Sequence, residues 1–530
     1  MVNYCNTLYF LIFLPIVILI YNITPKKHRP KILLLASYIF FFSISGKLII
    51  FLIFSSLSIH HFGLWLESIK SERDEILKNV QKEDKKEIKI TYKKKEKRII
   101  ILAILIHLGL LVFFKYTKFF GININNLLAQ LKVNYQIPLP KLLIPIGISF
   151  YTLEAISYII DVAREKIKPE KNLMSLALYL SFFPKTVEGP ISRYEDLKES
   201  LNAGEKTTYK SLCFGAQRIL YGLIKKVVVA DRLNILVKSI FSMSEFSNGG
   251  IVALGTIAYT IQLYMDFSGT MDVVIGSAEI FNIRLKENFR QPFFSKSISE
   301  FWSRWHITLG TWFKDYIFYP VSLSKPMKKL TTILRRHLGN HFGPLIAGSV
   351  ALFLVWLANG LWHGAAWTFV FFGMYHFFFI IIANITEPLV NKFYCVTHIN
   401  RENIIVKTIR IIKTTIIVLI GELFFRADRF KTALAMFNAL ITKFDFRVIM
   451  SKDIFNFGID KLDFIIVIIT LVFVFVISIL KEKNINIRKT LSTWQKPLRW
   501  LIFYILIFYL IIFGAYGMNY TPVDPMYANF

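Results

Sequence analysis

Residues 345–383 read LIAGSVALFLVWLANGLWHGAAWTFVFFGMYHFFFIIIA, and this stretch decides the fold. Two apolar runs, Leu345–Trp356 and Trp367–Ala383, flank a short polar segment that contains His363 between glycines. We read the runs as two membrane spans joined at a break. The glycines would let other groups approach His363 closely. Either His363 is an interfacial residue in a hairpin turn, or it is buried at the break, faces a cavity and transfers protons.

The composition outside this stretch is equally apolar. The chain has 530 residues, of which 54% are hydrophobic and 16% aromatic, which is too apolar for a soluble protein of this length. It carries 64 Lys and Arg against 35 Asp and Glu. Because the basic residues lie in loops between apolar runs, they indicate positive-inside topology and attraction to anionic lipid. No nucleic-acid-binding module is visible, so nucleic acid is not an expected partner.

The apolar runs predict a polytopic all-α membrane protein with roughly eleven to thirteen spans. The first run has no basic residue before it and no clear cleavage site, so we expect a retained span rather than a signal peptide. The charged stretch 67–98 is expected in the cytoplasm, as a solvated loop or a helix with Glu/Lys pairing. Parity then places both termini outside the cell, including the tail 514–530. The clearer expected spans are about 5–23, 32–44, 48–65, 99–114, 142–160, 345–356, 367–383, 404–425, 464–480 and 501–513.

The middle of the chain divides less cleanly. Four apolar pieces are interrupted by Pro, Gly and charge, which favours re-entrant or broken helices around a protein-lined cavity. We therefore predict N-terminal spans over 1–141, a catalytic core over 142–386 and C-terminal spans over 387–530. The interrupted pieces are 173–183, 214–240, 251–265 and 272–283.

Two further polar islands lie in this core, and ionisable groups in such surroundings are functional candidates. The first, residues 182–194, holds two prolines and a glycine, so it is either an ordinary loop or a re-entrant turn. The second spans residues 262–309. If its last part were helical, Trp302, Trp305 and His306 would share one face. A histidine among aromatic residues is either an interfacial anchor or a catalyst.

Other chemistries find no support in the sequence. Three distant cysteines match no disulfide framework, and no His, Cys, Asp or Glu cluster has a convincing metal spacing, so no metal is expected. The sequence lacks a Gly-rich phosphate loop and a Gly-x-Ser-x-Gly nucleophile elbow. Broken helices with Asp and Arg at membrane depth also suit a transporter or flippase for a lipid-linked sugar, which is the alternative from another class.

Five strings in a fixed order resemble the membrane-bound O-acyltransferase family, and most of all its bacterial branch. That branch includes proteins that acetylate alginate and proteins that transfer D-alanine to teichoic acid. The stretch after Arg401 and the ending 513–517 look more like the alginate type. One departure is Glu188, where relatives more often carry a small residue. The strings are FFPxxxxGPI at 182–191, MDFSG at 265–269, NFRQPF at 288–293, FWxRWH at 301–306 and NGLWHG at 359–364.

The resemblance implies a ring of helices around a central pore, with no bound cofactor. It implies that His363 is the near-universal family histidine and His306 the second histidine of the bacterial branch. Neutral His363 would be the general base, and His306 or a donor such as Asn288 would orient the donor or steady the oxyanion. The substrate-binding candidates are Asp266, Ser268, Asn288, Arg290, Trp302, Arg304, Trp305, Asn359 and Trp362.

The expected reaction moves an acyl group from a cytoplasmic thioester, with acetyl-CoA as the expected donor, to a hydroxyl on an extracellular polysaccharide. The acetyl group could also pass first to a partner protein, such as an extracellular SGNH-type acyltransferase. D-alanyl transfer to teichoic acid from a carrier-protein thioester is the alternative within the family. The expected location is the cell membrane.

Overall fold

The computed structural model describes residues 7–516 of the chain, and their regular structure is helical. One isolated bridge, between Phe289 and Trp305, is the extent of β-type pairing in this part. Helices satisfy every backbone polar group within the segment, as an apolar chain in lipid requires. The predicted all-α class is therefore confirmed. The start of the first expected span at Cys5 and the tail from Gly517 onward lie outside the described residues.

The helices form two compact units. The second unit is interrupted along the chain by a short segment of the first unit, Val274–Lys286. Among the described residues, one unit comprises 7–219 together with Val274–Lys286, and the other comprises Leu220–Val273 and 287–516. These boundaries differ from the three predicted segments, which were drawn from the order of the polar strings. The three-segment organisation stays a prediction.

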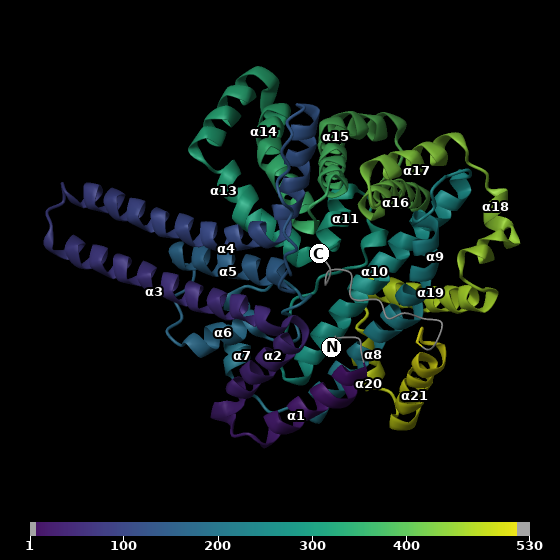
Figure 1. Ribbon diagram of the computed structural model, residues 1–530, viewed down its shortest axis with the longest axis horizontal. Coiled ribbons are helices and arrows are strands. Elements are labelled where there is room, and N and C mark those ends of the chain that lie inside the picture. The colour runs from purple at the N-terminus through teal and green to yellow at the C-terminus, as the bar shows by residue number, and fades with distance from the viewer. Residues whose placement is uncertain (1–6, 517–530) are drawn as a thin grey trace. The chain divides into compact units, whose positions relative to one another are not determined.

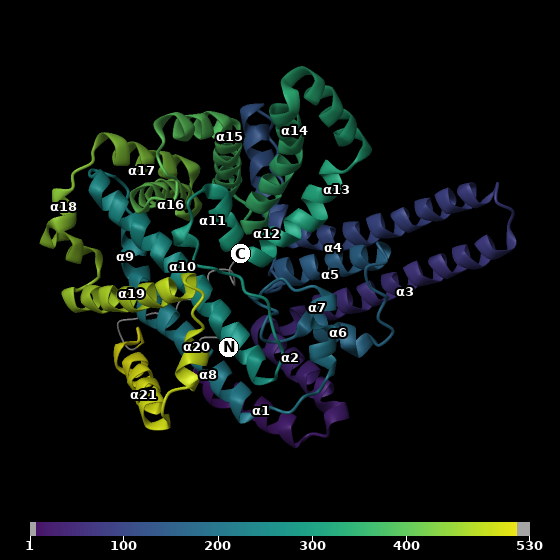
Figure 2. The same cartoon turned by 180° about the vertical axis from the view of Figure 1, so that it is seen from behind.

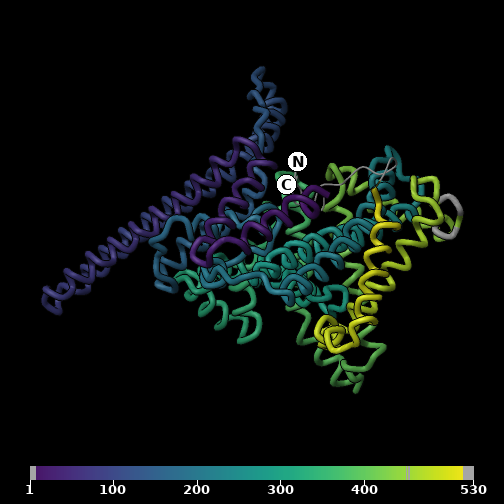
Figure 3. Tube along the Cα trace, turned by 90° about the horizontal axis from the view of Figure 1, so that it is seen from below, coloured from purple at the N-terminus to yellow at the C-terminus, as the bar shows by residue number. Residues whose placement is uncertain are grey.

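Two long antiparallel helices dominate the first unit. Helices α3 and α4 lie side by side as a hairpin, which Figures 1 and 3 show at the purple-to-blue end of the colour scale. Arg73 pairs with Glu96 at 3.1 Å across it, and the Tyr92 hydroxyl donates to Glu72 at 2.7 Å. The charged stretch 67–98 is thus largely helical with ionic pairing between its arms. The helices of this unit are η1 (Tyr9–Phe13), α1 (Leu14–Ile23), η2 (Lys26–His28), α2 (Arg29–Ser45), η3 (Gly46–Leu48), α3 (Ile49–Asn79), α4 (Lys85–Gln130), α5 (Ile148–Ala163), α6 (Leu173–Ser181), α7 (Tyr194–Asn202) and most of α8 (Tyr209–Leu223).

The second unit is built around α10 and the α14–α15 hairpin. Its helices up to that hairpin are η4 (Ile224–Ala230), α9 (Asp231–Phe241), α10 (Gly249–Ile280, of which Val274–Ile280 belong to the first unit), η5 (Pro292–Phe294), α11 (Ile298–Arg304), α12 (Ile307–Phe313), η6 (Lys314–Phe318), α13 (Tyr319–Ser322), α14 (Lys325–His363) and α15 (Trp367–Thr397). The remaining helices are α16 (Ile404–Arg426), α17 (Phe430–Thr442), α18 (Arg447–Met450), η7 (Lys452–Phe457), α19 (Lys461–Glu482), α20 (Ile487–Ser492) and α21 (Lys496–Phe513).

Seven helical stretches over residues 7–516 are long and apolar enough to cross a membrane. That number is below the predicted eleven to thirteen. Two expected spans account for part of the difference, because α5 has only 16 residues and α16 carries Lys407, Arg410 and Lys413 in its first half. The seven stretches are Lys26–Asn79, Lys85–Gln130, Gly249–Ile280, Lys325–His363, Trp367–Thr397, Lys461–Glu482 and Lys496–Phe513.

The hairpin of α14 and α15 confirms the two helices and the break read from residues 345–383. The helices lie side by side, as Figures 1 and 2 show, and the chain breaks between Gly364 and Ala366. Their contact is close because of small residues. A Cβ added at Gly360 would lie 2.5 Å from the Phe369 carbonyl oxygen, and one at Gly373 would lie 2.4 Å from that of Trp356.

The predicted interruption at residues 266–271 is wrong, because helix α10 runs unbroken through the MDFSG string. The glycine of that string allows close packing rather than a break. A Cβ at Gly222 would lie 2.5 Å from the Gly269 carbonyl oxygen, and a Cβ at Gly269 would lie 2.8 Å from that of Gly222. The two backbones therefore touch where α8 meets α10.

This contact predicts that Gly222→Ala lowers stability, although alanine normally favours a helix over glycine. The added methyl group would collide with backbone that cannot move aside, at a cost of about 1–3 kcal/mol. Gly109→Ala is the matched control, because a Cβ there meets no atom within 4 Å. The thermal unfolding midpoint in detergent should fall for Gly222→Ala and stay level or rise for Gly109→Ala. Equal midpoints would contradict the close contact.

Candidate active site

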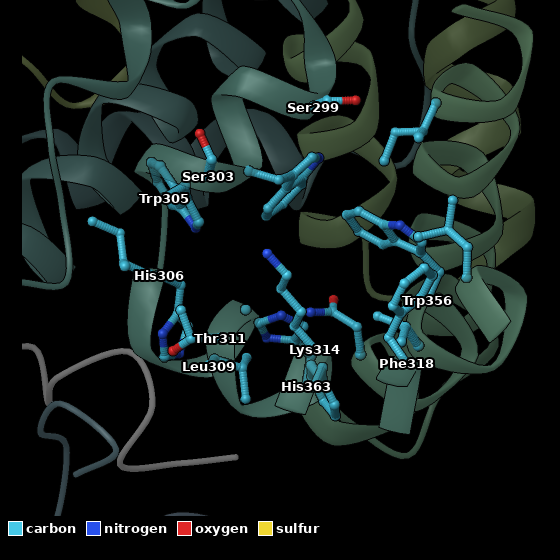
Figure 4. Close-up of a pocket in the computed structure, with 18 residues that line it drawn as sticks. Ser299, Ser303, Trp305, His306, Leu309, Thr311, Lys314, Phe318, Trp356 and His363 are labelled. Carbon is cyan, nitrogen blue, oxygen red and sulfur yellow. The ribbon is translucent and has the colours of Figure 1, made fainter. Parts of the chain in front are cut away.

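A pocket of about 410 Å³ lies within the second unit and has both candidate histidines in its wall. Helices α11, α12 and α14 and the π-helical turn η6 supply most of its lining, and Figure 4 shows these side chains around the space. Aromatic and aliphatic groups predominate. The polar and charged lining residues are Ser299, Ser303, His306, Thr311, Lys314, Asn359 and His363.

His363 is the last residue of α14, immediately before the break, and its side chain is buried. The imidazole packs edge-on against Phe425 and Phe372, with ring centroids 5.2 and 6.0 Å away. Gly364 is required beside it, because a Cβ there would lie 2.1 Å from the Phe369 ring. This geometry favours the buried, cavity-lining reading of His363 over an exposed interfacial turn.

His306 lies in the turn between α11 and α12 and has a left-handed backbone, with φ of +47°. Helix α11 ends at Arg304, so Trp305 and His306 lie outside it, and the helical condition under which they would share one face with Trp302 is not met. The backbone here forms hydrogen bonds with the neighbouring segment that contains Asn288 and Arg290. The Arg290 N–H donates to the Arg304 carbonyl at 2.9 Å, and the Ile307 N–H donates to the Asn288 carbonyl at 3.0 Å. The NFRQPF and FWxRWH strings are thereby paired.

The surroundings of His306 are apolar on several sides. The Phe267 ring centroid lies 4.9 Å away and that of Trp362 lies 5.5 Å away. His306 stands outside the seven candidate spans, and burial lowers its pKa to about 3. The imidazole is therefore neutral at physiological pH. Trp362 also contacts His363 at 5.1 Å between centroids, so one indole packs against both histidines.

Five of the eleven predicted site residues line the pocket: His306, His363, Trp302, Trp305 and Asn359. The other six lie outside its lining, and a role in binding substrate stays a prediction for them. Trp362 and Asn288 contact His306 but do not line the pocket themselves, and the side chain of Arg290 is exposed. Arg304 pairs with Glu300 at 2.8 Å and with Glu482 at 2.9 Å.

Asp266 and Ser268 contact buried lysines instead of the pocket. Lys226 lies 2.8 Å from Asp266, and Lys225 donates to Ser268 at 3.0 Å and pairs with Asp272 at 2.5 Å. Both lysines belong to the π-helical segment η4. A charge removed from water needs such a partner, so the observed contacts give these residues a structural part.

The first polar island is buried along residues 182–194, which favours the re-entrant reading over a solvated loop. Lys185 in its turn pairs with Glu154 of α5, and both side chains are buried. Glu188, the departure from the family pattern, is fully buried as well. All of this lies in the first unit.

Lys314 is a pocket residue that the sequence reasoning missed. It begins the π-helical turn η6, and Figure 4 shows its side chain extending into the pocket. Single π turns are frequent at functional sites. The available signal was one cation among Trp312, Phe313 and Tyr316, shortly after the Trp-His string. Over residues 7–516, no group of three or more His, Cys, Asp or Glu side chains could hold a metal ion.

Comparison with known proteins identifies relatives of this chain. The sequence model of the membrane-bound O-acyltransferase family matches residues 161–335, which include His306. The chain is 30% identical over 439 residues to a probable alginate O-acetylase AlgI of Pseudomonas aeruginosa, covering 83% of this chain and 75% of that protein. It is 29% identical to a peptidoglycan O-acetyltransferase of Helicobacter pylori, covering 64% of each. A teichoic acid D-alanyltransferase of Bacillus subtilis is 29% identical, over 47% of this chain and 61% of that one.

Fold and site together define a multi-pass helical membrane enzyme with a histidine-lined pocket. The chain belongs to the membrane-bound O-acyltransferase family. The chain is therefore an acyltransferase, and not the transporter or flippase considered as the alternative.

The lysine contacts predict that Asp266→Asn acts on stability. The substitution removes one of the two carboxylates beside the buried Lys226, which keeps Asp231 at 2.8 Å, and should cost about 1–3 kcal/mol of folding free energy. Asp428→Asn is the control, since Asp428 is exposed and pairs with Arg426 at 3.4 Å. Thermal unfolding in detergent should separate the two variants. A normal midpoint for Asp266→Asn with a raised KM would instead support substrate binding.

Proposed function

We propose that this enzyme transfers an acetyl group from a cytoplasmic thioester, acetyl-CoA, to a hydroxyl of an extracellular polysaccharide. The observation that carries the proposal is the placement of His306 and His363 on the wall of one pocket. Similarity to an alginate O-acetylase over 83% of the chain, against 47% for a D-alanyltransferase, supports acetyl as the group transferred.

A thioester carbonyl is already activated, so the enzyme needs no nucleophilic side chain. It needs a base for the hydroxyl proton and polar groups that stabilise the oxyanion. Neutral His363 takes the proton of the acceptor hydroxyl as its oxygen attacks the carbonyl carbon. The tetrahedral oxyanion then collapses, the C–S bond breaks, and the proton passes from His363 to the departing thiolate. Ester and free thiol are the products, so atoms and charge balance without an external reactant.

Lys314 supplies positive charge at the pocket. Among the eighteen lining residues it is the one lysine or arginine, and it is exposed. A cation there would attract the phosphate groups of the pantetheine-bearing donor.

The acceptor side follows from topology. If the basic segments Lys325–Arg336 and Arg401–Lys413 lie in the cytoplasm, the break at Gly364 lies toward the outer face or dips inward from it. His363 would then meet a glycan, or an SGNH-type partner that relays the acetyl group, from outside. Both termini would be extracellular in the same arrangement.

D-alanyl transfer to teichoic acid is the second candidate, favoured by the 29% identity to the Bacillus subtilis enzyme. The reacting bond is again a thioester, so the same two histidines would serve. The two candidates differ in the donor, which is acetyl-CoA in one and a D-alanyl carrier protein in the other. Supplying each donor to membrane vesicles would separate them.

His363→Ala should abolish transfer, because the hydroxyl loses its base, with a loss of about 10²-fold or more. Release of free thiol from acetyl-CoA in membrane vesicles gives the first measurement. Mass analysis of surface glycans from cells with wild-type or variant enzyme gives the second. His337→Ala is the matched control, since His337 is an exposed residue of α14. Near-normal transfer by His363→Ala at equal membrane expression would remove His363 from this role.

Lys314→Gln should weaken donor binding, because the pocket loses its cation. We expect KM for acetyl-CoA to rise about tenfold, as loss of one charged hydrogen bond predicts, with a smaller change in kcat. Lys325→Gln, at the exposed start of α14, is the control. An unchanged KM for Lys314→Gln would exclude contact with the donor phosphates.

A further inference from the structure

The contacts of Asn288 determine which of its side-chain atoms is the oxygen. Oδ1 accepts from the Thr308 backbone N–H at 3.0 Å and from the Thr308 hydroxyl at 2.9 Å. A backbone N–H can only donate, so the atom that faces it must be the carbonyl oxygen and not the amide nitrogen. The amide nitrogen faces the Met271 sulfur at 3.4 Å, which can accept its proton. The orientation of the Asn288 amide is therefore fixed.

The same oxygen contacts the ring of His306. Nδ1 of His306 lies 3.3 Å from Asn288 Oδ1, and both side chains are buried. An oxygen without a hydrogen cannot donate, so the imidazole nitrogen must be the donor, which places the proton of the ring on Nδ1. A neutral imidazole carries one N–H, and burial keeps this ring neutral. Nε2 is then the unprotonated nitrogen of the ring.

We propose that Asn288 is a positioning residue that holds His306 in the Nδ1–H tautomer, so that His306 serves acyl transfer as an acceptor through Nε2. This inference rests on the proposed function for its catalytic meaning. It changes the expected roles of two residues. Asn288 acts on His306 from outside the pocket lining and is not an oxyanion donor. His306 in this tautomer cannot donate to an oxyanion through Nε2.

The backbone around His306 supports the assignment, because it leaves the ring little freedom. His306 has a left-handed conformation, which costs energy for a residue other than glycine and persists only when its surroundings demand it. The Asn288 carbonyl accepts from the Ile307 N–H at 3.0 Å, and its side chain holds Thr308. One residue thus fixes the strained turn and the histidine in it.

The acceptor role suits a hydroxyl substrate. An acceptor hydroxyl that donates to Nε2 is oriented with its oxygen lone pairs available for attack on the thioester. His306 would orient the nucleophile or share its proton, while His363 completes the transfer. The other ionisable side chains among the residues that line the pocket are His363 and Lys314.

The direct test reads the tautomer by nitrogen-15 NMR of the full-length protein in lipid bilayers with ¹⁵N-labelled histidine. His306→Ala, or His306→Gln if the alanine variant does not fold, identifies the His306 signals by their loss. We expect a protonated Nδ1 and an unprotonated Nε2 in the wild type, and loss of this preference in Asn288→Ala. A protonated Nε2 in the wild type, or an unchanged tautomer in Asn288→Ala, would overturn the proposal.

Kinetics provide the functional test, with acetyl-CoA as donor and thiol release in membrane vesicles as readout. Asn288→Ala should lower kcat about 10²-fold, the lower end of what a positioned acid–base group contributes, and leave KM for acetyl-CoA near its original value. Met271→Leu is the matched control, because it removes the partner of the amide nitrogen and keeps the Oδ1 contacts. A kcat for Asn288→Ala equal to that of Met271→Leu would contradict positioning.

Asn288→Asp gives a readout that a purely structural role would not move. A carboxylate accepts the same bonds but favours the protonated imidazole, so it raises the pKa of His306. Protonated His306 has no lone pair on Nε2, so the acid limb of kcat must shift to higher pH. An unshifted limb in an active variant would refute the role. If the wild type released no thiol from acetyl-CoA, the proposed function would fail, while the NMR experiment would still decide the tautomer.

Discussion

Pairing of buried polar groups is the constraint on which this structure depends. An apolar chain has no water inside to solvate a charge, so each one needs a protein partner. Lys225 and Lys226 meet the acidic residues of α10, and Lys185 meets Glu154. Such pairs add little net stability, but loss of one partner is costly. They therefore specify which helix surfaces can meet within each unit.

The same constraint explains what the sequence could and could not reveal. Long apolar runs predicted helices, and the glycine-flanked segment around His363 correctly predicted a break between two of them. The MDFSG string misled because a polar string in a membrane protein has two explanations, a broken helix or an intact helix with buried partners. Only the position of η4 decides between them, and that contact is non-local in sequence.

Site prediction met the same limit. His306, His363, Trp302, Trp305 and Asn359 were predicted from strings with local signatures, and all five line one pocket. Lys314 carried no string of its own, and only the π-helical turn brings it into the lining. Asn288 was predicted as a substrate contact because polarity in sequence does not distinguish a group that touches substrate from one that holds its neighbour.

The two histidines reach the pocket by different backbone solutions, and this difference bears on their chemistry. His363 ends a helix before an extended glycine, among aromatic rings. His306 occupies a left-handed turn whose backbone and ring are both bonded to Asn288. A proton-transfer base must accept and release a proton, whereas a residue that orients a hydroxyl works best with one fixed tautomer. The rigid support of His306 fits the orienting task, which leaves proton transfer to His363.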